Sequence, residues 1–314
     1  MNQKQRVAND AEEGFNKCNL CLIGTGKILR SFAVRNEQHL YLCECMNCGC
    51  EFLFPQPSDD WLASEYSGDY QKRQSSIQRP KKAWFKALLN QLNVDFSKRS
   101  LLEIGSGEGD LVAAINEKWC QAEITAIEAN EECLPDYKRL KCNLITKSVE
   151  TWLAYQTKEC FDVIFLFDLL EHLRKPKQNL DQLVSRHLNT GGMVVATFPN
   201  VDSLSRKLLN VFWPQYKVEH LFYFSQSSVQ WLARELNLET IELSALTKTL
   251  PLDYLYAIGS RFGPLSVQNC CRWIHQHLPQ GIKQIALPLR LGEWLWVAQK
   301  RESLSKGISD ETSN

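Results

Sequence analysis

The sequence predicts an α/β fold with helices on both faces of a doubly wound sheet of seven strands, preceded by a small cysteine-rich module. From residue 100 on, short apolar runs alternate with longer amphipathic segments, the pattern of a parallel sheet with helical crossovers. A glycine-rich turn follows the first of these runs, and six of the twelve cysteines lie between Cys18 and Cys50. With 314 residues, the chain can form one large domain and a smaller one.

Changes in composition divide the chain into five parts. The cysteine-rich part ends in Pro55-Gln56-Pro57, a stiff segment that separates modules. The predicted parts are a flexible leader (1–14), the cysteine module (15–57), a helical connector (58–99), the main domain (100–300) and a polar tail (301–314). Within the main domain, residues 250–290 are rich in Pro, Leu and aromatic residues, and we expect an insertion there.

Periodicity gives the elements of the main domain. The predicted strands are 101–104, 124–128, 144–146, 162–167, 193–198, 240–243 and 294–299. The predicted helices are 110–119, 131–140, 176–188 and 226–236. We expect Gly191 and Gly192 to end the third helix, because a helix C-terminus favours the positive φ that glycine adopts.

The charge balance argues against a nucleic-acid partner. Lys and Arg total 36, as do Asp and Glu, whereas proteins that hold RNA or DNA usually carry a basic excess. A loose basic cluster over 72–86 is interpreted as a solvated helix start. No apolar run approaches the ~18 residues of a membrane span, and the polar N-terminus is unlike a secretory signal. We therefore expect a cytoplasmic protein without a membrane span.

Two pairs of cysteines have the spacing of metal ligands. Each pair fits one tight turn, and two facing turns supply four thiolates, the tetrahedral set of a structural Zn²⁺ site. A reducing compartment disfavours disulfides, and a redox dithiol is the alternative interpretation. Cys43 and Cys50 lack this spacing and are left out of the ligand set. The predicted ligands are Cys18 and Cys21 of the first pair and Cys45 and Cys48 of the second.

The glycine-rich turn has the features of a nucleoside site. Gly105, Gly107 and Gly109 follow an apolar strand, in a Gly-x-Gly-x-Gly spacing that differs from the Gly-x-Gly-x-x-Gly of nicotinamide sites. Glu103 lies two residues before the first glycine. Glu128 ends the next strand, where a carboxylate can bind both hydroxyls of a ribose. The alternative for Glu128 is an N-cap of the following helix.

Taken together, these segments resemble the class I S-adenosylmethionine-dependent methyltransferases, which have a Rossmann-like fold. The cysteine module, with Phe52-Leu53-Phe54-Pro55-Gln56-Pro57, resembles the N-terminal zinc ribbon of certain bacterial methyltransferases, some of which act on nucleotide-linked sugars. The resemblance implies that the glycines line the methionine and ribose of the cofactor and that Ser148 and Val149 flank the adenine. The implied cofactor-binding residues are Glu103, Gly105, Ser106, Gly107, Gly109, Glu128, Ser148, Val149 and Asp168.

The resemblance also indicates an acceptor site. Glu219-His220, followed by the aromatic segment 222–224, is similar to the Glu-His segment that carries the general base of sugar C-methyltransferases. A hydroxyl or carbon acceptor must lose a proton, and a histidine that titrates near neutrality suits this task. His220 is the first candidate and His172 the second, and an acceptor that needs no base is the third reading. The expected catalytic residues are His220, Glu219 and His172, and the expected substrate contacts are Tyr66, Tyr70 and Tyr223.

The predicted function is methyl transfer from S-adenosyl-L-methionine to a small polar acceptor, a sugar or nucleotide-sugar hydroxyl or carbon. Two alternatives are an RNA methyltransferase that binds its substrate through the ribbon and a nicotinamide-dependent oxidoreductase. For residues 250–290, a substrate cap, a homodimer contact and a peripheral membrane contact all stay open.

Overall fold

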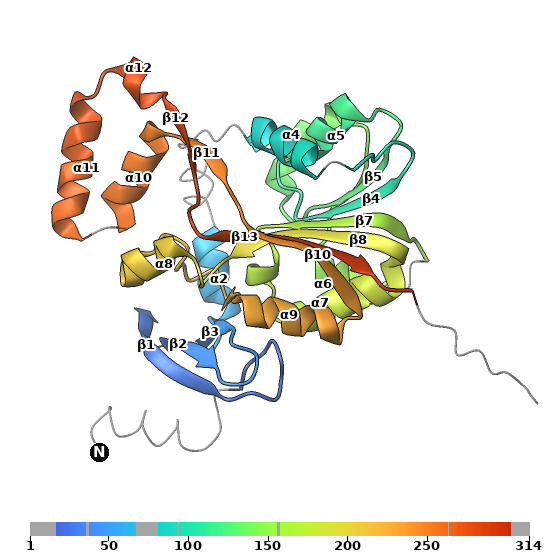
Figure 1. Cartoon of the computed structure of the whole chain (residues 1–314), viewed down its shortest axis with the longest axis horizontal. Coiled ribbons are helices and arrows are strands. Elements are labelled where there is room, and N and C mark those ends of the chain that lie inside the picture. The colour runs from blue at the N-terminus through green and yellow to red at the C-terminus, as the bar shows by residue number, and fades with distance from the viewer. Residues whose placement is uncertain are drawn as a thin grey trace, which may run out of the picture.

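The computed structural model describes residues 17–35, 38–66, 81–92, 94–155, 158–262 and 264–302. Its centre is a sheet of seven strands, the number that the sequence predicted, and their order is β10-β13-β8-β7-β4-β5-β6 (Figure 1). The strands are β4 (Ser100–Ile104), β5 (Glu123–Ile127), β6 (Asn143–Ile145), β7 (Phe161–Phe167), β8 (Leu188–Pro199), β10 (Leu238–Ala245) and β13 (Glu293–Lys300). The strands from β8 to β6 run parallel, β13 is antiparallel to β8, and β10 is antiparallel to β13.

The strand order reverses at β4. From β4 the chain first builds outward through β5 and β6 and then returns to place β7 and β8 on the other side. In open α/β sheets, ligands bind at such a switch point, outside the carboxyl ends of the strands. The turns after β4 and β7 are therefore the expected location of the site.

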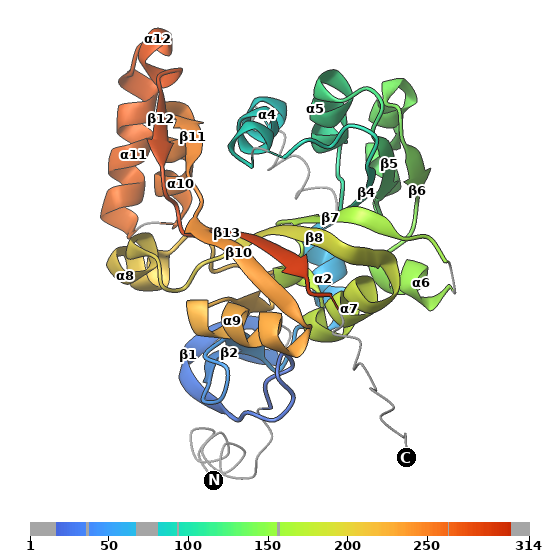
Figure 2. The same ribbon diagram turned by 45° about the vertical axis from the view of Figure 1, so that its right-hand side comes forward.

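Helices cover both faces of the sheet (Figures 1 and 2). One face carries α4 (Lys81–Gln91) and α5 (Asp110–Lys118), and the other carries α6 (Val149–Ala154), α7 (Pro176–Gln182) and α9 (Gln226–Glu235). Alternate residues of β7 divide between the two cores: Val163 and Phe165 pack on the α5 side, and Ile164 and Leu166 on the α9 side. This double burial explains the continuous apolar run of β7.

The cysteine-rich module shares its sheet with the main domain. Its strands are β1 (Gly26–Arg35), β2 (Gln38–Cys45) and β3 (Glu51–Phe54), and the fourth strand is β9 (Phe222–Tyr223). β3 and β9 pair antiparallel, with Glu51 opposite Tyr223. The module and the α9 side of the main domain form one apolar core.

Two predicted helices differ in the structure. The third predicted helix continues from α7 through one wide turn, Leu183–His187, directly into β8, so Gly191 and Gly192 lie inside the strand and not at a C-cap. They fall where the β7–β8 register shifts, because Phe161 pairs with Leu188 and Val163 with Met193. Residues Glu131–Arg139 form 3₁₀ turns instead of an α-helix, and Pro135, which lacks an N–H, disfavours the longer helix.

The insertion lies between β10 and β13, the last two strands of the sheet. A two-stranded stem, β11 and β12, carries three helices that stand away from the sheet (Figure 2). Its elements are β11 (Lys248–Pro251), α10 (Leu252–Phe262), α11 (Leu265–His277), α12 (Gln280–Lys283) and β12 (Ala286–Leu289). Two shorter helices, α2 (Asp59–Tyr66) and α8 (Leu204–Leu209), lie between the insertion and the ribbon strands in Figure 1.

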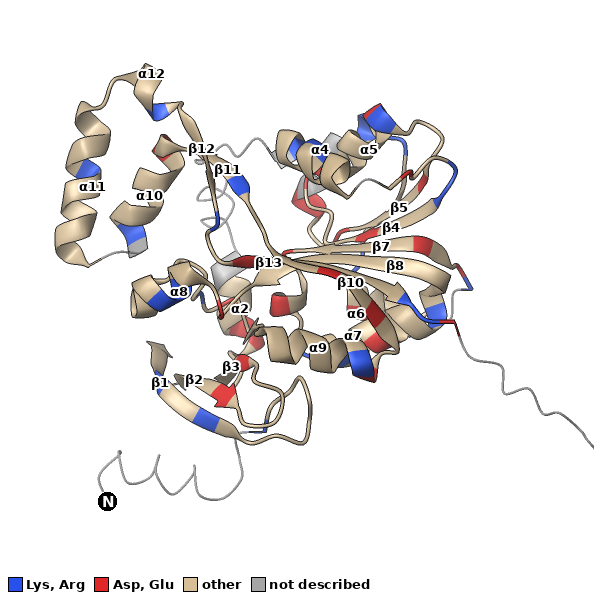
Figure 3. Cartoon of the chain, viewed as in Figure 1, with Lys and Arg blue, Asp and Glu red and all other residues tan. Residues whose placement is uncertain are grey.

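The helix lengths and the distribution of charge bear on possible membrane and nucleic-acid partners. Within the described ranges, no helix is both long and apolar enough to cross a membrane. Figure 3 shows Lys and Arg distributed over several helices and strands and interspersed with acidic residues. This distribution agrees with the zero net charge of the chain.

Candidate active site and metal centre

The glycine turn leaves β4 at the switch point. Gly105, Gly107 and Gly109 all have positive φ, at 74°, 54° and 78°. A Cβ added at Gly107 would meet nothing within 4 Å, so this residue borders open space. A Cβ at Gly109 would lie 2.5 Å from Leu140 Cδ1, so a side chain there would displace Leu140. Gly107 is thus the place where a ligand can approach the main chain.

Glu128 connects the end of β5 to this turn. Its carboxylate accepts hydrogen bonds from the main-chain N–H of Gly107 and of Asn130, both at 2.7 Å. Asn130, and not Glu128, is the N-cap of the following helical turns, because its side chain accepts from Glu132 N at 3.0 Å. The N-cap interpretation of Glu128 is therefore wrong, and its carboxylate lies beside the open space at Gly107.

Glu103 and Ser106 lie beneath the turn. Glu103 is buried, and its Oε2 has no hydrogen-bond partner among the described residues. Burial raises the pKa of this carboxyl well above its usual value, and the nearby acids Asp110 and Glu128 raise it further. Ser106 Oγ accepts from Tyr137 OH at 2.6 Å and is held in place by it. An unpartnered acidic oxygen under an open glycine turn fits a ligand that brings a positive charge and hydrogen-bond donors, as S-adenosylmethionine does.

Ser148 and Val149 follow β6, at the same edge of the sheet. Ser148 Oγ accepts from Thr151 N at 3.1 Å and caps α6, so the side chain expected beside the adenine serves the helix. Val149 is buried in the core. Any ligand contact of these two residues would be left to their main chains.

Asp168 ends β7 and connects the sheet to the insertion. Its φ is 49°, its Oδ1 accepts from Thr197 Oγ1 at 2.9 Å, and its Oδ2 lies 3.6 Å from Lys248 Nζ. Lys248, at the base of the insertion, also pairs with Glu293 and lies over the ring of Trp84. Sequence reasoning missed Lys248, because nothing in its neighbourhood along the chain marks it.

Three residues with ligand atoms meet just beyond β7. Glu171 and His172 lie on the 3₁₀ turn Leu170–His172, and with His220 they offer three ligand atoms within 4.8 Å of one another. The rings of His172 and His220 are perpendicular, with centroids 4.7 Å apart. The structure thus brings together both histidines that the sequence singled out. Glu171 was missed, although its place between Asp168 and His172 in one turn was a usable signal.

Glu171 and His220 are buried and His172 is partly buried, and this burial sets the charge of the cluster. Burial lowers the pKa of His172 to about 4 and that of His220 well below its usual value, and it raises the pKa of Glu171. The expectation of a histidine that titrates near neutrality is therefore wrong, because both rings are neutral at pH 7. Glu171 Oε2 and His220 Nδ1 have no hydrogen-bond partner among the described residues.

The remaining expected contacts are placed differently. Glu219 contributes its main-chain oxygen, which lies 2.9 Å from His172 Nδ1. Tyr223 is fully buried, and its hydroxyl donates to Lys217 O at 2.8 Å, so it does not face an open site as expected. Tyr66 ends α2, and its side chain, like all of Tyr70, lies outside the described residues.

The four predicted cysteine ligands converge in the ribbon. The thiol groups of Cys18, Cys21, Cys45 and Cys48 are buried and lie within 4.8 Å of one another. Cys18 and Cys48 have their sulfurs 3.9 Å apart, and Cys21 and Cys45 3.5 Å. Four thiolates on one Zn²⁺ at ~2.3 Å have sulfurs about 3.8 Å apart, so the set fits this ion.

Cys43 and Cys50 do not join this set. Cys50 Sγ donates to the main-chain oxygens of Glu51 and Tyr223, both at 3.3 Å. Burial raises the pKa of Cys43 to about 12, so it stays a thiol. Sequence spacing and structure therefore select the same four residues.

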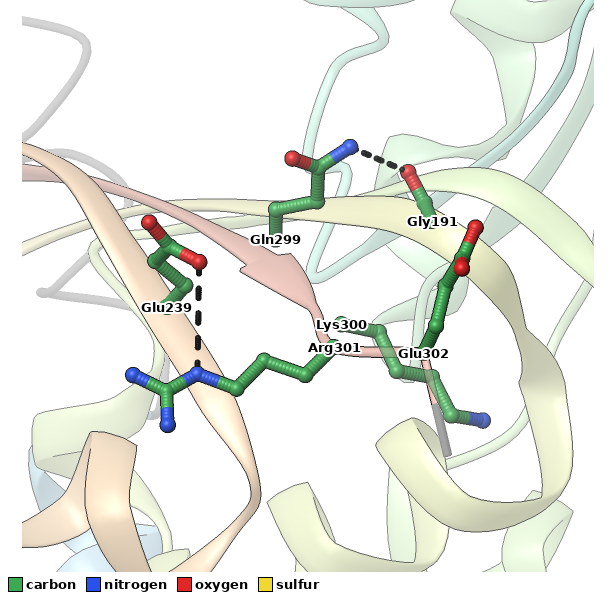
Figure 4. A pocket seen from close by; sticks show the side chains of 6 residues that line it. All are labelled: Gly191, Glu239, Gln299, Lys300, Arg301 and Glu302. Carbon is green, nitrogen blue, oxygen red and sulfur yellow. Dashed lines mark hydrogen bonds and ion pairs between the residues drawn. The ribbon is translucent and has the colours of Figure 1, made fainter. Parts of the chain in front are cut away.

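A hollow of about 320 Å³ lies elsewhere, beside the end of β13 (Figure 4). It is lined by Gly191, Glu239, Gln299, Lys300, Arg301 and Glu302. β13 is antiparallel to β8, so this end of β13 lies at the amino ends of the parallel strands, opposite the glycine turn. The hollow is therefore separate from the switch point.

A comparison with protein families identifies the class of this protein. Residues 74–243, more than half of the chain, match the family described as a methyltransferase domain, and the chain belongs to this family. It is a class I S-adenosylmethionine-dependent methyltransferase, which decides against the nicotinamide-dependent alternative. No curated protein matches the sequence.

One solved structure shows the same fold. The plantazolicin methyltransferase BpumL, in complex with a triazolic desmethylPZN analog and SAH, is 17% identical with a TM-score of 0.51, over 77% of this chain and 95% of that chain. The YcgJ protein from Bacillus subtilis is 14% identical with a TM-score of 0.49, over 70% of this chain and 100% of that chain.

Proposed function

We propose that the chain transfers a methyl group from S-adenosyl-L-methionine to a hydroxyl or carbon of a small polar acceptor, a sugar or nucleotide-sugar. The observation that carries this proposal is the arrangement at the switch point. The open glycine turn follows β4, and the cluster of Glu171, His172 and His220 follows β7, the neighbouring parallel strand. One edge of the sheet thus offers a cofactor site and, beside it, groups that can take up a proton.

In this proposal the cofactor lies over Gly107. Bound there, S-adenosylmethionine would supply a methyl group on a sulfonium. The neutral thioether that departs from this methyl group is an excellent leaving group. Glu128 would accept the ribose hydroxyls, since its carboxylate already lies at the turn and accepts main-chain N–H groups. The buried Glu103 carboxyl would partner the positive end of the ligand. These residues hold the methyl in place, and positioning supplies much of the rate in such a displacement.

The acceptor would lose its proton at the histidine cluster. Neutral imidazoles are in the protonation state that a proton acceptor needs, and burial keeps both rings neutral. His172 is only partly buried and gives the acceptor a route to the cluster. The insertion over 248–289 would act as a substrate cap, because Lys248 at its base contacts Asp168 beside the site.

The zinc ribbon would form one wall of this site. β3 of the ribbon pairs with β9, directly after His220, and Leu53 N donates to Leu221 O at 3.0 Å. The Cys48 main-chain oxygen accepts from Ser227 at the start of α9. A Zn²⁺ on the four thiolates would stabilise the ribbon and, through these bonds, the position of His220. Since the metal has four protein ligands, its role is structural.

A mass-spectrometric screen tests this function. Purified protein with S-adenosylmethionine is offered nucleotide sugars and small polar metabolites, and we expect one class to gain one methyl group. The same gain on an RNA, with a salt-sensitive RNA gel shift, would favour the RNA methyltransferase instead. No methylated sugar at any protein concentration, with a different acceptor class methylated, would overturn the proposed acceptor.

A further inference from the structure

The cluster of Glu171, His172 and His220 has the chemistry of a cation site. All three residues come from segments that meet at the carboxyl end of β7, and each offers one ligand atom within 4.8 Å of the other two. Glu171 is 1% exposed and His220 4%. Glu171 Oε2 and His220 Nδ1 are both without a hydrogen-bond partner in the described part of the chain. Buried polar atoms without a partner are rare, and an ion accounts for them.

The main chain fixes the protons of both imidazoles. His172 Nδ1 lies 2.9 Å from the main-chain oxygen of Glu219, which can only accept, so the proton is on Nδ1 and Nε2 carries the lone pair. His220 makes its hydrogen bond with the main chain of Gln215, and since Nδ1 has no partner, Nε2 is the donor. Histidines that bind metals commonly donate their other N–H to a carbonyl in this way.

The cluster therefore gathers two imidazole lone pairs and a carboxylate oxygen. We propose that these three residues bind one divalent first-row metal ion, at a site separate from the four cysteines. Two imidazoles and one carboxylate suit Mn²⁺, Fe²⁺, Co²⁺ or Zn²⁺ better than the all-oxygen ligands that Mg²⁺ and Ca²⁺ prefer. Ligands at ~2.1 Å from one ion lie about 3 Å apart, so side chains whose ligand atoms are all within 4.8 Å of one another can reach one ion by a small movement.

Such an ion would take part in the proposed methyl transfer, and this part of the inference rests on the proposed function. Three protein ligands leave coordination positions open, and an acceptor hydroxyl that binds there has a lowered pKa. The hydroxyl proton then passes to solvent and the oxygen attacks the methyl carbon as the carbon–sulfur bond breaks. With the ion bound, His220 would act as a ligand, in place of the role of proton acceptor that it has in the proposed function without the ion. This removes the need for a buried imidazole of low pKa to take the proton itself.

Mn²⁺ binding followed by electron paramagnetic resonance tests the site. The protein is first loaded with one Zn²⁺ per chain in the ribbon, whose thiolates do not favour Mn²⁺. We expect one bound Mn²⁺ per chain and hyperfine couplings from two imidazole nitrogens. Glu171→Gln should weaken Mn²⁺ binding at least ~10-fold. The exposed Glu159→Gln is the matched control and should bind Mn²⁺ like the wild-type protein.

The possible results separate the cation from the enzyme activity. No bound Mn²⁺, or Mn²⁺ without nitrogen couplings, overturns the site even if Glu171→Gln fails to fold, because this result comes from the wild-type protein. Equal Mn²⁺ affinity of folded Glu171→Gln and wild type also overturns it. Methyl transfer to a sugar by protein that binds no Mn²⁺ would overturn the cation site and leave the proposed function intact. Mn²⁺ binding without any methylated sugar would support the cation site and count against the proposed function.

Discussion

The glycine turn allows a matched pair of substitutions that separates binding from folding. At Gly107 an added methyl group would meet no protein atom within 4 Å, and at Gly109 it would lie 2.5 Å from Leu140 Cδ1 and 3.1 Å from the Tyr137 ring. Both residues have positive φ, which costs a non-glycine residue roughly 1–2 kcal/mol. Only Gly109→Ala adds a clash, worth about 1–3 kcal/mol more.

The free energy of unfolding should therefore fall by roughly 1–2 kcal/mol in Gly107→Ala and by roughly 2–5 kcal/mol in Gly109→Ala. For a domain of this size, these losses correspond to melting temperatures lower by about 2–8 °C and about 4–20 °C. In contrast, Gly107→Ala should weaken the binding of S-adenosylhomocysteine at least ~10-fold, because its methyl group enters the space that the ligand would occupy.

Thermal unfolding and calorimetric titration measure the two effects on the same samples. The reasoning is refuted if Gly107→Ala binds S-adenosylhomocysteine as tightly as the wild-type protein, because the space beside Gly107 is then not the cofactor site. It is also refuted if Gly107→Ala loses more stability than Gly109→Ala.

Three further predictions concern the acceptor site and the ribbon. His220→Ala should lower turnover at least ~100-fold while the heat of S-adenosylhomocysteine binding persists, and the exposed His39→Gln is the control. Unchanged turnover of His220→Ala would remove His220 from the mechanism. Tyr223→Phe should lose about 1 kcal/mol of stability, from the bond to Lys217 O, and keep turnover within about threefold, whereas a large loss of turnover would mean that the hydroxyl contacts substrate. Cys48→Ser should reduce the zinc content, measured by mass spectrometry of the metal, below one ion per chain. Turnover should also fall, because Cys48 contacts Ser227 at the start of α9. A full zinc content would contradict the ligand set.

Local patterns along the sequence sufficed for the sheet and the glycine turn. Most strands of the sheet are short apolar runs, and a buried parallel strand such as β7 stands out from its neighbours. Gly107 and Glu128 follow consecutive strands, so their meeting follows from the geometry of a parallel sheet. The two cysteine pairs were equally readable, because metal ligands obey fixed spacings.

Contacts between distant segments could not be read in this way. Lys248 reaches Asp168 across 80 positions, and no local pattern marks such a residue. Tyr223 is buried where β9 pairs with the ribbon strand β3, and the low pKa of His172 follows from the burial of its ring. A two-residue strand that completes the sheet of another module has no periodicity from which it could be predicted.

The central claim is that the carboxylate at the end of β5 and the glycine turn after β4 together hold the cofactor. Titration calorimetry of S-adenosylhomocysteine into the wild-type protein and into Glu128→Ala tests it most directly. The account predicts one binding site per chain in the wild type and an affinity at least ~10-fold weaker in folded Glu128→Ala. No heat from the wild-type protein, or equal affinity of the two proteins, would contradict it.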